Sequence, residues 1–97
     1  MNYIPNDKIK ELYTALLSLK DEAECNAFLR DLLTGEELEE FSNRWKVARM
    51  LSLKKTYVEI EKETGMSSTT IARISKWLEK GMGGYKSVIK RLYEKNK

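Results

Sequence analysis

A run of four hydroxyl side chains followed by two basic residues is the set of side chains in this sequence best suited to chemistry. The set comprises Ser67, Ser68, Thr69, Thr70, Arg73 and Lys76. The 97-residue chain has no histidine and one cysteine, so it lacks the usual base that activates a hydroxyl or thiol nucleophile. Hydroxyls beside positive charges instead suit hydrogen bonds to phosphates and to the edges of bases.

The sequence offers few residues suited to a metal site, a catalytic site or a membrane span. The lack of histidine and near lack of cysteine argue against a zinc site, and we expect no metal. No acidic residue stands in a pocket-like apolar setting, so we expect no catalytic residue, no cofactor and no enzyme activity. No stretch has the length and apolarity of a signal peptide or a membrane span, which predicts a cytoplasmic protein that does not bind membranes.

The net charge of +3 hides two halves of opposite sign. Residues 1–41 contain 4 Lys/Arg and 10 Asp/Glu, whereas residues 42–97 contain 14 Lys/Arg and 5 Asp/Glu. A basic half of net +9 next to an acidic half of net −6 is typical of a protein that binds a polyanion. The alternative is that long surface side chains have segregated by chance.

Apolar residues recur at helical spacing in six stretches, and no stretch alternates as a strand would. Turn and cap signals separate the stretches, and three of them begin with capping-box spacing, in which a cap residue is followed three positions later by Glu. The three pairs are Asp21 with Glu24, Thr34 with Glu37 and Thr56 with Glu59. The sequence therefore predicts an all-α fold with helices near 9–17, 21–33, 34–53, 56–64, 67–80 and 84–95.

The apolar stripes of the first three helices and of the last are hard to cover within one chain of this size. We therefore predict a single domain that forms an intertwined homodimer, with a compact monomeric bundle as the alternative. In this interpretation residues 1–54 form the core and dimerisation helices, 56–80 a helix-turn-helix, and 84–95 a C-terminal dimerisation helix.

Residues 56–80 have the spacing of a helix-turn-helix. Ile60 should face inward from the first helix, Gly65 should make the turn, and Met66, Ile71 and Ile74 should dock the second helix. Such motifs place the start of the second helix in the major groove of DNA. A plain αα-hairpin is the alternative. Glu61 departs from the usual pattern, because a small residue commonly follows the inward one where the two helices cross.

Double-stranded DNA is therefore the predicted partner. Ser67 is needed as a helix cap, and the hydroxyls after it are free to contact phosphates or bases. Tyr57 has two interpretations, a contact with the DNA backbone or packing against the second helix. The candidate DNA-binding residues are Thr56, Tyr57, Lys62, Ser67, Ser68, Thr69, Thr70, Arg73 and Lys76.

Three segments together resemble the tryptophan repressor superfamily, and most closely its small TrpR-like branch of the YerC/YecD type. They are "LLTGEELEEFSNRW", the "TY.EI...TG.S..TI.R" core and the "WL..G.GGY" tail, and the similarity covers Phe28 to Tyr85. The resemblance implies an interlocked, all-helical dimer with a helix-turn-helix on each side. It also implies that Ser67 to Thr70 face the bases.

The same resemblance implies a site for an amino-acid corepressor. Arg44 and Arg73 match the two arginines that hold tryptophan in ligand-binding members, whereas Ile74 and Trp77 replace a glycine and a serine. We therefore interpret the pocket as vestigial, with Trp77, alone or together with Ile74, as a built-in substitute for the ligand, and expect no small-molecule effector. The alternatives are that Trp77 is simply a core residue and that Arg44 pairs with a nearby acid or lies on the surface.

The sequence as a whole predicts a dimeric transcription regulator, acting as a repressor that occupies a two-fold symmetric operator. The competing hypothesis is a protein-interaction adaptor whose acidic N-terminal half binds a basic partner.

Overall fold

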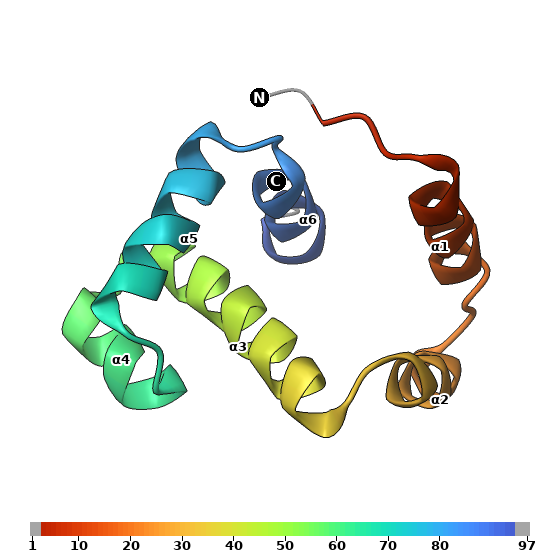
Figure 1. The fold of residues 1–97 in the computed structure, drawn as a ribbon. Coiled ribbons are helices and arrows are strands. Elements are labelled where there is room, and N and C mark those ends of the chain that lie inside the picture. Colours follow the sequence, from red (N-terminus) through yellow and green to blue (C-terminus); the bar gives the residue numbers. More distant parts are fainter. Residues whose placement is uncertain (1–2, 95–97) are drawn as a thin grey trace. The chain divides into compact units, whose positions relative to one another are not determined.

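The computed structural model describes residues 3–94, and all regular structure in that range is helical. Within residues 3–94 the chain forms six helices. Figure 1 shows them in sequence order. The predicted all-α class and number of helices are confirmed, although residue 95 of the predicted last helix lies outside the described range. No helix within residues 3–94 combines the length and apolarity needed to cross a membrane. The helices are α1 (Asp7–Leu17), α2 (Glu22–Leu32), α3 (Gly35–Ser52), α4 (Tyr57–Thr64), α5 (Ser68–Lys80) and α6 (Gly84–Tyr93).

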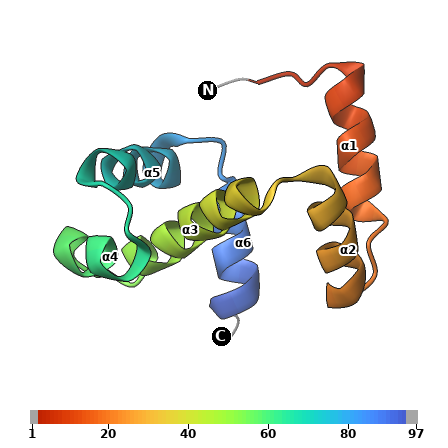
Figure 2. The same ribbon diagram turned by 60° about the horizontal axis from the view of Figure 1, so that its bottom comes forward.

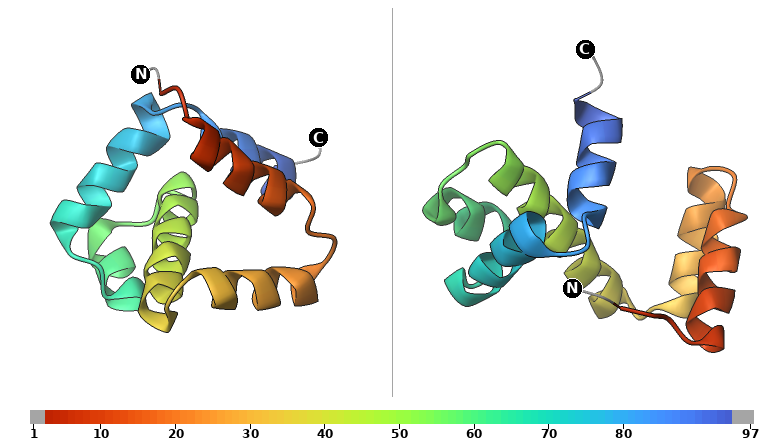
Figure 3. Two further views of the ribbon diagram at one scale, coloured as in Figure 1. Left: turned by 45° about the vertical axis from the view of Figure 1, so that its right-hand side comes forward. Right: turned by 90° about the horizontal axis from the view of Figure 1, so that it is seen from above.

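Two units make up the described chain, and the division between them falls within α3, after Glu39. The first unit contains α1 and α2, which a short segment joins (Figure 3). Asn6 caps α1 and Asp21 caps α2, each accepting a hydrogen bond from a backbone N–H three residues on. The capping box predicted at Asp21 is only half correct, because Glu24 Oε1 accepts from the N–H of Lys20 at 3.0 Å and not from that of Asp21.

Neither α1 nor α2 buries a side chain. Leu17 is 86% exposed, and Tyr13, Leu16 and Leu32 are also largely accessible. These residues include members of the apolar stripes that predicted the two helices. Because apolar side chains gain free energy by leaving water, stripes of this size normally pack against another surface.

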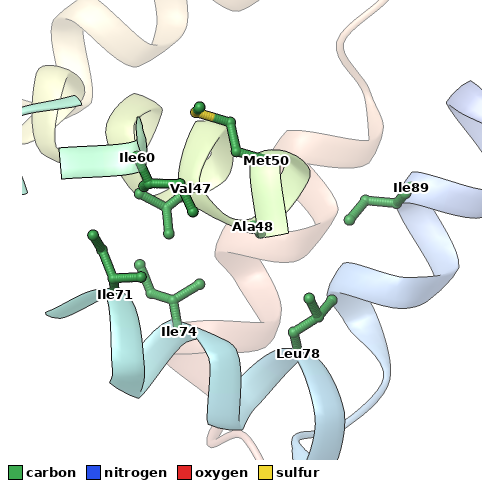
Figure 4. Close-up of a cluster of buried hydrophobic side chains, with 8 residues drawn as sticks. All are labelled: Val47, Ala48, Met50, Ile60, Ile71, Ile74, Leu78 and Ile89. Atoms are coloured by element: carbon green, nitrogen blue, oxygen red, sulfur yellow. The ribbon is translucent and has the colours of Figure 1, made fainter. Parts of the chain in front are cut away.

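The second unit, residues 40–94, holds the core. Its helices meet around eight buried residues, and Figure 4 shows the isoleucines of α4 and α5 directed toward the side chains of α3. α4 and α5 lie side by side in both Figure 1 and Figure 2, and α5 also packs against α6. The buried set is Val47, Ala48, Met50, Ile60, Ile71, Ile74, Leu78 and Ile89.

The N-termini of α3 and α4 have the predicted capping boxes. The N–H of Glu37 donates to Thr34 Oγ1 at 3.0 Å, and Glu37 Oε1 accepts from the N–H of Thr34 at 2.9 Å. Thr56 and Glu59 make the same reciprocal pair at 3.1 and 2.8 Å. The two capping boxes satisfy backbone donors that a helix N-terminus leaves without partners.

The turn between α4 and α5 depends on a glycine. Gly65 ends α4 with φ at +73°, a left-handed conformation that side chains with a Cβ rarely adopt. Two residues later Ser67 caps α5 by accepting a hydrogen bond from the N–H of Thr70. The predicted turn and cap are both confirmed, and they reverse the chain within a few residues so that Ile71 can reach Ile60.

Truncating a buried isoleucine of this core should reduce the stability of the fold substantially. Ile71 is fully buried, so Ile71→Ala should lower the free energy of unfolding by about 2–5 kcal/mol because it removes apolar burial and leaves a cavity. Val58→Ala, on the exposed face of α4 where Val58 is 72% accessible, is the matched control and should change it by less than about 0.5 kcal/mol. Urea unfolding at one fixed protein concentration measures both. Equal reductions in the two variants would contradict this description of the core.

The capping box of α4 predicts a pH dependence. The hydrogen bond from the backbone N–H of Thr56 lowers the pKa of Glu59 below its ordinary value of 4.5, with further help from the Thr56 hydroxyl and from Lys55. A lowered folded-state pKa stabilises the protein above pH 4.5, and this contribution is lost as the pH falls through the folded-state value. The stability difference between wild type and Glu59→Gln should therefore shrink in acid. A constant difference for Glu59→Gln across acid pH would refute the assignment.

Candidate nucleic-acid interface

The start of α5 shows how the four hydroxyls divide their roles. Ser67 Oγ accepts from the N–H of Thr70 at 3.2 Å and donates to Thr70 Oγ1 at 3.1 Å. Thr70 is half-buried, whereas Ser68 and Thr69 are exposed in the first turn of the helix. Ser67 and Thr70 thus build the helix end, and Ser68 and Thr69 present hydroxyls to the solvent.

Basic side chains continue along the same two helices. Arg73 and Lys76 lie one and two turns further along α5, and Lys62 lies in the last turn of α4. α5 has no acidic residue in its first turn, so the partial positive charge of its N-terminus is not offset there. This end of the motif suits an anionic partner such as a phosphate backbone.

The remaining candidates lie at the start of α4. Thr56 is exposed while its side chain caps the helix, and Tyr57 is 40% exposed beside it. Of the nine residues proposed to contact DNA, Thr70 alone is half-buried and the other eight are exposed. Glu61, which departs from the usual pattern, is exposed as well, so it points away from the crossing of α4 and α5.

A pocket of about 330 Å³ opens between α3, α5 and the start of α6. It brings together the four residues assigned to the vestigial corepressor site, Arg44, Arg73, Ile74 and Trp77, and is completed by Glu40, Thr70 and Tyr85.

The two bulky residues of the pocket occupy different places. Ile74 is 4% exposed and belongs to the core, so its side chain packs between α5 and α3 (Figure 4). Trp77 is 43% exposed and lines the opening without closing it. The idea that Trp77 replaces a ligand therefore stays a prediction.

Arg44 is paired within its own helix. Its Nη2 lies 3.2 Å from Oε2 of Glu40, and its Nε–H donates to the same oxygen at 3.3 Å. The guanidinium carbon also lies 5.7 Å from the centre of the Phe41 ring. The structure thus agrees with the alternative interpretation of Arg44, in which this arginine pairs with a nearby acid.

Two pocket residues, Glu40 and Tyr85, had no predicted role, and Thr70 was predicted only to contact DNA. Glu40 precedes Arg44 by four residues on one helix, and this i,i+4 spacing is a signal that could have been used. Tyr85 carried no such signal, because it reaches the pocket only through the turn after α5. Its ring stacks on Trp45 with 6.3 Å between ring centres, which joins α6 to the middle of α3. Within residues 3–94, no acidic and thiol side chains cluster in a way that could hold a metal ion.

Known proteins match this architecture over nearly the whole chain. The family described as Trp repressor protein matches residues 7–93. The uncharacterized protein YerC of Bacillus subtilis (strain 168) is 40% identical over 87 residues, which cover 90% of this chain and 84% of YerC.

Two crystal structures share the fold. A TrpR-like protein from Eubacterium eligens ATCC 27750 superposes with a TM-score of 0.88 at 38% identity, covering 95% of each chain. A Staphylococcus aureus protein superposes with a TM-score of 0.87 at 33% identity, covering 96% of this chain and 93% of its own. The match to the family, the helix-turn-helix and these neighbours establish that the chain belongs to the Trp repressor family, a family of DNA-binding regulators and not of enzymes.

Proposed function

We propose that this protein is a sequence-specific transcription regulator that represses by occupying a two-fold symmetric operator. The observation that carries the proposal is the exposed first turn of α5, with Ser68 and Thr69 free of the capping role, on a helix docked through Ile71 and Ile74. A rigid helix with short polar side chains at its N-terminus can approach base edges closely, and Arg73 can add contacts to phosphate or base.

A homodimer would supply the second half of the operator contact. The exposed apolar residues of α1, α2 and α6 support this assembly, because a second copy could bury them. In the proposed division, residues 1–54 and 84–95 dimerise and residues 56–80 bind DNA. Two recognition helices about 34 Å apart would then enter successive major grooves on one face of the duplex.

The proposed regulator needs no corepressor. Trp77 already places an indole at the pocket, and Arg44 already has a carboxylate partner in Glu40. An adaptor that binds a basic protein is the second candidate, and the acidic charge of residues 1–41 favours it.

Selection of random duplexes on the purified full-length chain, with molecular mass measured in the same buffer, tests these two functions. We expect a palindromic consensus bound by a species of twice the chain mass at near-physiological salt. Enrichment of nothing by a dimer, with or without added L-tryptophan, would favour the adaptor. Enrichment only with L-tryptophan would overturn the corepressor-free mechanism.

Affinity should depend on salt through the basic residues of the motif. Replacing Lys62 or Lys76 with alanine should weaken binding to all duplexes similarly and reduce the slope of log K against log salt by about 1 for each phosphate that the variant no longer binds. Lys10→Ala, on α1 and outside the motif, is the control and should leave the slope unchanged. The slopes follow from titrations at several salt concentrations. If wild-type affinity changed little with salt, the basic half would not be the DNA-binding surface.

A further inference from the structure

We propose that Glu40 is a specificity residue that keeps anionic ligands out of the pocket between α3, α5 and α6. Its carboxylate would do so by occupying the guanidinium of Arg44. The inference deepens the proposed function and rests on it, because it explains how a regulator of this fold would act without an effector.

The lining of the pocket would otherwise suit a small planar acid. Two guanidinium groups, Arg44 and Arg73, are the side chains best able to grip a carboxylate, and the rings of Trp77 and Tyr85 offer flat apolar surfaces. A volume of about 330 Å³ is at the lower end of the range for small-molecule sites. The chemistry of the lining, taken without Glu40, is therefore that of an aromatic carboxylate site.

Glu40 changes that chemistry from inside the pocket. Arg44 places both Nη2 and Nε within 3.3 Å of Glu40 Oε2, so Glu40 occupies one of the edges by which this guanidinium could bind a ligand carboxylate. The two side chains are 50% and 45% exposed, so the pair lies at the mouth of the pocket. Glu four residues before Arg on a helix is the favourable order for such a pair. Among the described residues, Arg73 has no comparable ion pair, so the contact distinguishes the two arginines.

Phe41 adds a second restraint on the same guanidinium. The centre of its ring lies 5.7 Å from the Arg44 guanidinium carbon, so Glu40 and Phe41 hold the arginine against α3 from successive positions of one helix. Any incoming carboxylate would have to displace Glu40 from Arg44 or lie beside it. Two like charges at such a distance repel, and this penalty falls on anions and not on neutral molecules of the same shape.

The test uses isothermal calorimetry on the full chain without DNA. The probes are indole-3-propionate, an anion, and indole-3-propionamide, its neutral counterpart. Glu40→Gln removes the charge and Glu40→Ala removes the whole partner, whereas Glu39→Gln, on the exposed neighbouring position, is the control. We expect about a two- to fivefold gain in affinity for the acid in both Glu40 variants and none for the amide, because solvent screens the charges of this half-exposed pair. Wild type and Glu39→Gln should bind the acid weakly and equally.

Three outcomes would overturn the proposal. Wild type could bind the acid as tightly as Glu40→Gln, the Glu40 variants could gain affinity for the amide as much as for the acid, or they could gain affinity for neither. The second result would mean that Glu40 acts by shape, and the third that Trp77 or another side chain closes the pocket. Because the readout contains no DNA, each outcome is separable from failure of the duplex selection, which alone tests the proposed function.

Discussion

The docking of α5 onto α3 and α4 is the interaction on which the rest of this structure depends. Ile60, Ile71 and Val47 are fully buried against one another, and together they set the angle at which the second helix of the motif leaves the turn. Their burial provides the hydrophobic free energy that offsets the ordering of a short helix and a tight turn. Without it, α4, at eight residues, would be too short to persist in water.

Local hydrogen bonds fix the ends of the helices that this packing holds together. The cap by Ser67 and the left-handed Gly65 stop one helix and start the next within three residues. The capping box of Thr56 and Glu59 fixes the first turn of α4. These contacts are individually weak and lie on the surface, but each removes alternative conformations of the segment that carries the exposed hydroxyls. The polar face of the motif is thus positioned by an apolar core beneath it.

The pocket beside the motif draws on the same helices. Ile74 contributes to the core and, with Trp77 on the same helix, to the lining, so the pocket and the docked face of α5 share a side chain. The stack of Trp45 on Tyr85 connects α6 to α3, and Tyr85 also lines the pocket. The carboxylate that lies against Arg44 belongs to the same helix, so this contact forms without the entropy cost of binding a separate molecule.

The sequence by itself determined the six helices of the described residues, the caps at Thr34, Thr56 and Ser67, and the motif. Helical spacing, the Thr-x-x-Glu pairs, Gly65 and Ser67 act within a few residues, so local physical chemistry was enough to locate them. The inward roles of Ile60, Ile71 and Ile74 followed from the same spacing. Only the tertiary structure decided that Ile74 is buried while Trp77 is 43% exposed. It also decided that Glu40 forms an ion pair with Arg44 and that Tyr85 lines the pocket. Those outcomes depend on how distant segments pack and on which of several neighbours a long side chain meets, and neither is encoded in spacing along one helix.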